Sequence, residues 1–142
     1  MALISGVKDF FGGNYDYKRD THKKLNLLGV AEAHIVLKSR LWHHIQGGAH
    51  ESLEAALFDH SGACQLGNWI NGNELGHLCG VQEFEQLNEA HRQFHRLGTL
   101  IVEKLKAGDR GGASEIFKDG YNTSLRNMIQ SLTWLNRHLY EN

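Results

Sequence analysis

The chain contains no proline in its 142 residues, and it also lacks a large net charge and long apolar runs. Because proline breaks helices, its absence leaves long helices possible throughout the sequence. The 15 lysines and arginines nearly balance the 16 aspartates and glutamates, so the chain has no overall attraction for nucleic acid or anionic lipid. Its apolar runs are far shorter than the roughly 20 residues that a membrane-spanning helix needs.

Cysteine is scarce as well, with one residue at Cys64 and one at Cys79. Residues 1–7 contain no basic stretch before their few apolar residues, which does not fit a secretory signal. We therefore expect a cytoplasmic protein in a reducing compartment. There a thiol is more often a metal ligand or a reactive group than half of a disulfide. Histidine, by contrast, is abundant, with ten residues.

The spacing of apolar residues predicts an all-α protein. Apolar side chains recur every three or four residues over long stretches, which is the period of an amphipathic helix, and no stretch alternates as a strand would. We expect an N-terminal lead-in at residues 1–16 and a single domain at residues 17–142. The domain is predicted to be an antiparallel four-helix bundle with a short helical connector that carries the cysteine motif. The predicted helices cover residues 17–45, 50–60 and 81–107 and a last stretch from Phe117 to Leu139, with a glycine break at 47–48 and a loop at 108–112.

Three histidines lie on helical stripes that are otherwise apolar: His34 on the first long helix, and His91 with His95 on a later one. Burying an unpaired imidazole costs a few kcal/mol, so each needs a partner, either a backbone carbonyl or water, or a metal. Among ten histidines, one pair four residues apart is expected by chance, so the spacing of His91 and His95 alone does not indicate a metal site. Their position on an apolar stripe is what favours one. Two imidazoles at i and i+4 share a helix face, and Cys64 could add a thiolate, a soft ligand that favours zinc.

These residues follow the pattern of a known family. The run Asp59 to Ile70, DHSGACQLGNWI, precedes Phe84 and the HxxxH of His91 and His95. Together with His34 they resemble the chemoreceptor zinc-binding (CZB) domain family, whose pattern is a histidine on the first helix, a CxLGxW-type motif and then HxxxH. The resemblance covers roughly residues 20–140, and it is specific because the three elements occur in this order at separations similar to those of the family.

The resemblance implies a four-helix bundle that holds one Zn²⁺ through His34, Cys64, His91 and His95. In the family this module accompanies chemoreceptor signalling domains or diguanylate cyclase domains, and it senses zinc or, in some members, hypochlorous acid through the cysteine. A closed set of four ligands leaves no open position for a substrate, so the resemblance implies a non-enzymatic sensor. Whether the chain is an excised domain or a stand-alone member stays open.

Two other functions fit a histidine-rich helical protein. A hemerythrin-like di-iron oxygen carrier or sensor needs bridging carboxylates, for which His50 with Glu54 is the obvious pair here. An interaction bundle with incidental histidines needs no metal at all. The roles of two further residues are open: His60 fits a place beside the metal or on the surface, and Cys79 fits a loop thiol, a spare ligand or a redox partner of Cys64.

Large apolar residues outside the core-facing stripes predict self-association. A second apolar face on a helix that already has a core face suggests a partner, and related modules serve signalling proteins that act as dimers. We therefore expect a homodimer with a two-fold axis and contacts from the first or last helix. The residues on which this expectation rests are Ile35, Val36, Trp42, Leu100 and Trp134.

Overall fold

A computed structural model describes residues 26–61, 64–70, 72, 78 and 80–140 of the chain. Within these ranges helices are joined by short turns and no strand occurs, so the predicted all-α class is confirmed. The lead-in predicted for residues 1–16 lies outside the described ranges. The helices are α2 (Leu27–Gln46), α3 (Leu53–Ser61), α4 (Gln65–Ile70), α5 (Gln82–Lys106), α6 (Arg110–Ile116) and α7 (Asn122–Tyr140), and a π-helical stretch, η2 (Phe117–Tyr121), joins the last two.

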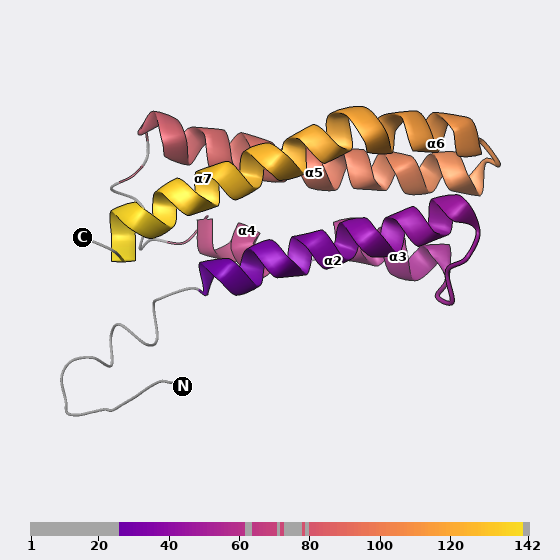
Figure 1. Ribbon diagram of the computed structural model, residues 1–142, viewed down its shortest axis with the longest axis horizontal. Coiled ribbons are helices and arrows are strands. Elements are labelled where there is room, and N and C mark those ends of the chain that lie inside the picture. The colour runs from indigo at the N-terminus through magenta and orange to yellow at the C-terminus, as the bar shows by residue number, and fades with distance from the viewer. Residues whose placement is uncertain (1–25, 62–63, 71, 73–77, 79, 141–142) are drawn as a thin grey trace, which may run out of the picture.

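The long helices lie side by side along one axis of the molecule (Figure 1). Helix α5 packs against α3, α6 and α7, while α2 packs against α3 and α7, so α5 is the most widely contacted element. Short turns join α2 to α3 and α5 to α6. The core runs along the inside of this arrangement, and its fully buried side chains include Leu41, Leu66, Leu87, Phe94 and Tyr121.

Helix α2 begins later than the sequence pattern predicts. A continuous helix over residues 17–45 was expected, but Asn26 has an extended backbone, and its side-chain oxygen accepts a hydrogen bond from the Gly29 N–H at 3.0 Å. This N-cap makes Leu27 the first helical residue, so the prediction of one helix through residue 26 is wrong. The predicted end is confirmed. Gly47 closes the helix at φ 81°, a left-handed conformation that glycine adopts without strain.

The loop predicted at residues 108–112 is shorter in the structure. Gly108 has φ 81° and turns the chain, but α6 already begins at Arg110. The Asp109 side chain accepts a hydrogen bond from the Gly112 N–H at 2.9 Å and so caps the new helix. The two consecutive glycines therefore form its first turn instead of a loop, because the cap outweighs their weak helix propensity.

The π-helical stretch η2 was not predicted from the sequence. It faces both Phe117 and Tyr121 into the core, where Trp42 stacks on Phe117 and Phe94 stacks on Tyr121 with ring centroids 5.0 and 4.6 Å apart. Such wider turns often occur at functional positions of helical proteins. Here the turn brings the Tyr121 hydroxyl into the centre of the molecule.

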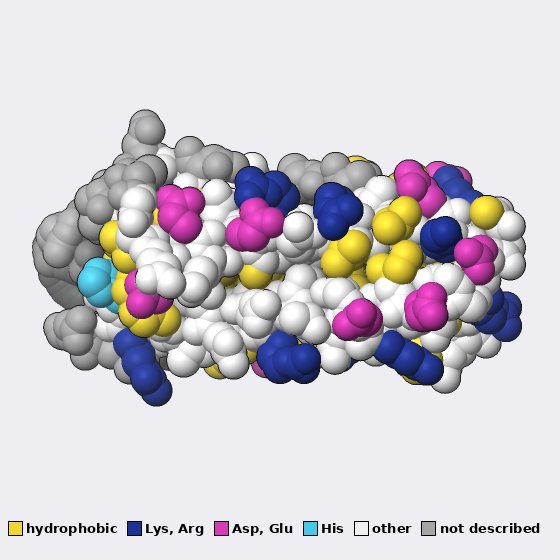
Figure 2. All heavy atoms as spheres, turned by 90° about the horizontal axis from the view of Figure 1, so that it is seen from above, with side chains coloured by type: hydrophobic (Ala, Val, Ile, Leu, Met, Phe, Trp, Pro, Cys, Tyr) yellow, Lys and Arg dark blue, Asp and Glu magenta, His cyan; other side chains and the backbone are white. Residues whose placement is uncertain are grey.

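The surface agrees with the even charge balance of the chain. Figure 2 shows a face on which lysine and arginine alternate with aspartate and glutamate, with no large patch of one sign. No described helix is long and apolar enough to cross a membrane. The expectation that Trp42 and Trp134 lie on a free face is wrong, since both are half-buried and pack against the core. Ile35 and Val36 on α2 are exposed, as that expectation requires, whereas Leu100 is half-buried.

Candidate metal centre

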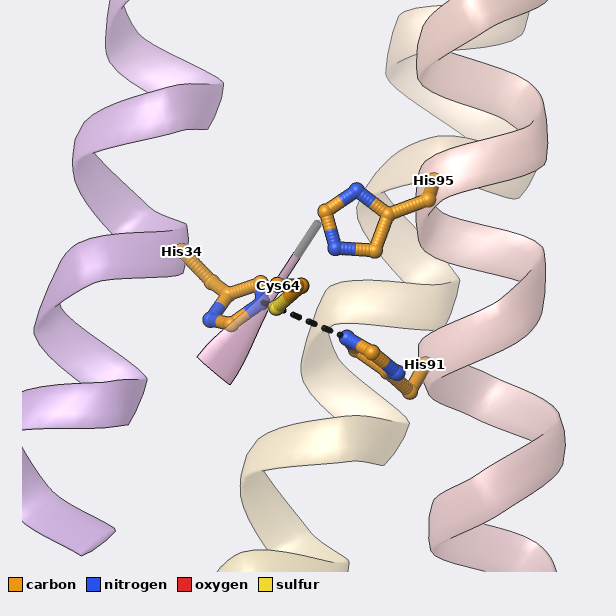
Figure 3. A group of neighbouring side chains, drawn as sticks. All are labelled: His34, Cys64, His91 and His95. Carbon is orange, nitrogen blue, oxygen red and sulfur yellow. Dashed lines mark hydrogen bonds between the residues drawn. The ribbon is translucent and has the colours of Figure 1, made fainter. Parts of the chain in front are cut away.

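The four residues predicted to bind zinc come together from three separate parts of the fold. His34 lies in the middle of α2, Cys64 directly precedes α4, and His91 and His95 lie one turn apart on α5. One possible ligand atom from each residue lies within 4.8 Å of the other three. Figure 3 shows the three imidazoles arranged around the sulfur. The cluster offers three nitrogen ligands and one sulfur ligand from neutral imidazoles and a thiolate, the combination found in closed zinc sites.

The His34 ring is oriented by a hydrogen bond to its own helix. Its Nδ1 lies 2.8 Å from the backbone carbonyl oxygen of Val30, and because a carbonyl only accepts, Nδ1 carries the proton. A neutral ring then has its lone pair on Nε2, which lies 3.6 Å from Cys64 Sγ. A buried histidine whose second nitrogen donates to a carbonyl is the usual arrangement of a metal-ligating imidazole.

Cys64 is placed close to His91 by the turn into α4. Its carbonyl accepts the first hydrogen bond of this helix, from the Asn68 N–H at 2.9 Å, and its Sγ lies 3.3 Å from His91 Nε2. Gly67 permits this approach, since a Cβ at that position would stand 3.3 Å from His91 Cε1.

The electrostatic surroundings of Cys64 favour a thiolate. Partial burial by itself raises the pKa of the thiol, but the neighbouring imidazoles of His34, His91 and His95 and the backbone N–H of Gly67 lower it, and together they bring the pKa to about 3. The sulfur is therefore charged at neutral pH. A thiolate is both the form that binds a metal and the form that oxidants attack.

The surroundings of the His95 ring show whether the four residues fit a metal. Neither of its ring nitrogens has a hydrogen-bond partner, although both atoms are buried. Burial also lowers the pKa of His95, and the nearby His91 adds to this, while Cys64 opposes it. The ring is therefore a neutral imidazole with unsatisfied polar atoms, a condition that native structures rarely leave without a ligand. A zinc ion among the four residues would satisfy the nitrogen that faces Cys64 and His91, so the residues fit the metal.

His60 lies beside the cluster. The sequence alone left open whether this residue lies near the metal or on the surface. It is only 5% exposed, at the end of α3, and its ring centroid lies 5.4 Å from that of His95. Its Nε2 lies 3.3 Å from the Tyr121 hydroxyl, and its Nδ1 has no partner. Burial, helped by the nearby His95, His34 and Arg40, lowers the pKa of His60 to about 3, so the ring is neutral.

A pocket of about 620 Å³ connects the cluster with the surface. It opens between α2 and the segment from α3 to α4, and its lining includes His34, Cys64 and His95. Exposed apolar side chains, Val36 at 51% and Phe58 at 71%, flank the pocket. The pocket therefore offers a small molecule a route toward Cys64.

The residues proposed for a di-iron site do not join the cluster. His50 and Glu54 are both exposed, and the Glu54 carboxylate pairs with Lys106 at 2.6 Å. The cluster itself contains no carboxylate. The donor set therefore does not fit a di-iron centre, which needs bridging carboxylates. Cys79, the possible spare ligand or redox partner, lies outside the described residues.

Fold and site together define a helical domain with a three-histidine, one-cysteine metal centre. Residues 34–102 match the family model of the chemoreceptor zinc-binding domain, and the match begins at the first of the four clustered residues and includes the other three. The chain therefore carries a chemoreceptor zinc-binding domain, as its sequence motifs predicted. Comparisons with curated proteins and with solved structures gave no significant match.

Proposed function

We propose that this chain is a non-enzymatic zinc-binding sensory domain in which His34, Cys64, His91 and His95 hold one Zn²⁺. The observation that carries the proposal is the convergence of three imidazoles and one thiolate from α2, α5 and the start of α4 within 4.8 Å. Zinc would supply a positive charge that holds these elements together, and all four positions of a tetrahedral site would then be filled by protein. Such a site binds a metal tightly but leaves no position for a substrate, which supports a sensory role.

The proposed domain is an antiparallel four-helix bundle. The packing of α5 against α3 and α7, and of α2 against the same two helices, supports this arrangement. Short connections between successive helices, such as Gly47 to Ser52 and Ala107 to Asp109, favour antiparallel neighbours. In this bundle the metal would join α2 to α5 and to the start of α4, which lies between them in the chain.

The proposed stimulus is zinc itself or an oxidant. The pocket beside Cys64 gives a small oxidant access to the sulfur, and the lowered pKa of the thiol keeps that sulfur reactive at neutral pH. Oxidation removes a good ligand and so loosens the metal. The proposed setting is the cytoplasm, beside a chemoreceptor signalling or diguanylate cyclase module in the parent chain or a partner protein.

The first test is the metal content of the purified chain. We expect native mass spectrometry to show one zinc per chain, and we expect zinc affinity to fall at acid pH as the imidazoles bind protons. The double variant His91→Ala/His95→Ala removes two of the four ligands and should lose the metal, while the exposed pair His50→Ala/Glu54→Ala should keep it. Two irons per chain, or full zinc retention by the first variant, would contradict the proposal.

We further propose that the domain forms a homodimer through α2. Leu28, Ile35 and Val36 on this helix are exposed apolar side chains, and so is Phe58 on α3, which favours a partner on this side of the molecule. Loss of zinc would shift α2 relative to α5 and alter the dimer geometry, which is an output that needs no catalysis.

Light scattering at micromolar concentration tests the dimer. We expect a mass near twice the 16.0 kDa of one chain, and we expect Ile35→Glu/Val36→Glu to return it to one chain. Exposed positions on α7, such as Arg126→Glu, provide a control that changes charge without touching α2. A mass near 16 kDa for the unaltered chain, with and without zinc, would exclude the dimer and this route of signalling.

A further inference from the structure

The strongest unexplained feature of the molecule is a set of buried nitrogens without partners. Among the described residues, the buried side-chain polar atoms that lack a hydrogen bond are His95 Nδ1, His95 Nε2 and His60 Nδ1. All three belong to two neighbouring rings, whose centroids are 5.4 Å apart. Each such atom costs about 1–3 kcal/mol when it is left unsatisfied, so their concentration in one place calls for a common explanation.

Zinc accounts for one of the three nitrogens. Figure 3 shows one ring nitrogen of His95 pointing toward Cys64 and His91 and the other pointing away from them. If the inner nitrogen binds the metal, the outer nitrogen of the neutral ring must carry the proton. That outer N–H is then a buried donor, and the metal makes it a stronger one. It needs an acceptor on the side of His95 that faces away from the ligands.

His60 Nδ1 has the properties of that acceptor. The His60 ring is neutral and buried, its centroid lies 5.4 Å from that of His95, and its Nδ1, like the outer nitrogen of His95, has no other partner, so the two rings are close enough for one to bind the other once the outer nitrogen carries the proton. The opposite nitrogen of His60, Nε2, lies 3.3 Å from the Tyr121 hydroxyl oxygen. With Nδ1 as the acceptor, Nε2 carries the proton and donates it to Tyr121.

The absence of a side chain at Gly98 on α5 leaves room for the His60 ring. Gly98 lies one turn after His95 on α5, and a Cβ at this position would stand 2.3 Å from His60 Nδ1. Any side chain at residue 98 would therefore push the His60 ring away from His95. On the other side, η2 places Tyr121 against His60 with ring centroids 5.7 Å apart.

We propose that His60 is a positioning residue of the metal centre, which accepts a hydrogen bond from the outer N–H of His95 and donates one to Tyr121. This inference rests on the proposed zinc site and extends it. The chain of hydrogen bonds orients His95 as the Val30 carbonyl orients His34, and it connects the metal to α3 and to η2 as well as to the helices that carry the ligands. Binding of zinc is thereby coupled to the position of η2, which carries Tyr121 and leads into α7.

Zinc affinity of His60 variants tests the proposal. His60→Leu fills the space without offering an acceptor and should weaken zinc binding by about 10–100-fold, the usual effect of losing such a partner, with one zinc still bound. His60→Gln retains an oxygen that can accept the bond and should restore most of the affinity. Leu135→Ala, which opens a cavity elsewhere in the core, should lower stability without changing zinc affinity.

The glycine offers a second, matched pair of variants. Gly98→Ala should displace the His60 ring and weaken zinc binding to a similar extent as His60→Leu. Gly111→Ala is the control, since nothing lies within 4 Å of a Cβ at that position, and it should leave the affinity unchanged. If His60→Leu and Gly98→Ala both bind zinc as tightly as the unaltered chain, His60 is not a positioning residue.

NMR of the unaltered zinc-loaded chain tests the hydrogen bond without any substitution, and so covers the case in which His60→Leu does not fold. We expect nitrogen–nitrogen coupling through the hydrogen bond between the His60 and His95 rings, and a slowly exchanging His95 N–H proton. A His95 N–H that exchanges freely or couples to no ring nitrogen would overturn the proposal. Failure of the zinc site itself would be distinct, because the unaltered chain would then bind no zinc.

Discussion

Oxidant-triggered zinc release is expected to disappear when Cys64 is replaced by serine. In the unaltered chain, hydrogen peroxide or hypochlorous acid should convert the thiolate to a sulfenic acid: a sulfur–oxygen bond forms, two electrons leave the sulfur, and hydroxide or chloride departs from the oxidant. The sulfenic acid is a poor ligand, and zinc should appear in solution. A chromophoric zinc chelator measures the release as it occurs.

The serine variant separates this chemistry from other routes of metal loss. Cys64→Ser should bind zinc more than about 100-fold more weakly, because removal of a ligand exceeds the 10–100-fold effect of removing its hydrogen-bond partners. Zinc loaded at high concentration should then leave at a rate that does not depend on oxidant. Cys79→Ser is the control and should release zinc as the unaltered chain does. Equal loss of the response in both variants would indicate a disulfide between Cys64 and Cys79 instead.

Removal of zinc is expected to lower the melting temperature of the domain by more than about 10 °C. A metal that binds only the folded state, at a free concentration 1,000 times its Kd, stabilises it by about 4 kcal/mol. For a domain of this size each kcal/mol corresponds to roughly 3–5 °C. In the metal-free protein the ring nitrogens of His95 stay buried without partners, which is one physical source of this difference.

Calorimetry with added zinc and with a chelator measures this difference. The variant His91→Ala/His95→Ala should melt at the same temperature in both conditions, because it can no longer hold the metal. Its melting temperature also shows how far the folded state depends on the metal. If the unaltered chain melts at one temperature with and without zinc, the metal does not hold α2 and α5 together, and the proposed link between occupancy and helix position fails.

Zinc and His60 would act on the same set of elements. The four proposed ligands join α2, α5 and the start of α4, and the proposed hydrogen bonds from His95 through His60 to Tyr121 extend this set to α3 and η2. Arg40 strengthens the contact between α2 and α3 through its ion pair with Asp59 at 2.9 Å. A stimulus at Cys64 would therefore change the packing of several helices, and in the proposed homodimer the exposed apolar side chains of α2 would carry this change to the second copy.

The sequence located most of the core correctly. On the first long helix the residues that recur every three or four positions are buried at Val30, His34, Leu41 and Ile45, and on the last helix they are buried from Tyr121 to Leu135. Helical periodicity suffices for this because one face of each helix must be apolar to pack. Local hydrogen bonds were harder to foresee. The caps at Asn26 and Asp109 begin α2 and α6 at positions that periodicity does not mark.

The sequence by itself determined the all-α class, the core-facing stripes and the four candidate ligands, because helical period, ligand chemistry and the order of the motifs are properties of the chain alone. Only the tertiary structure decided the place of His60. Whether this residue faces solvent or the metal centre depends on the space above Gly98 and on the π-helical turn that carries Tyr121, both far from it along the chain. The same holds for Trp42, whose burial depends on Phe117 across the core. Contacts between distant segments set the surroundings of a side chain, and local periodicity carries no information about them.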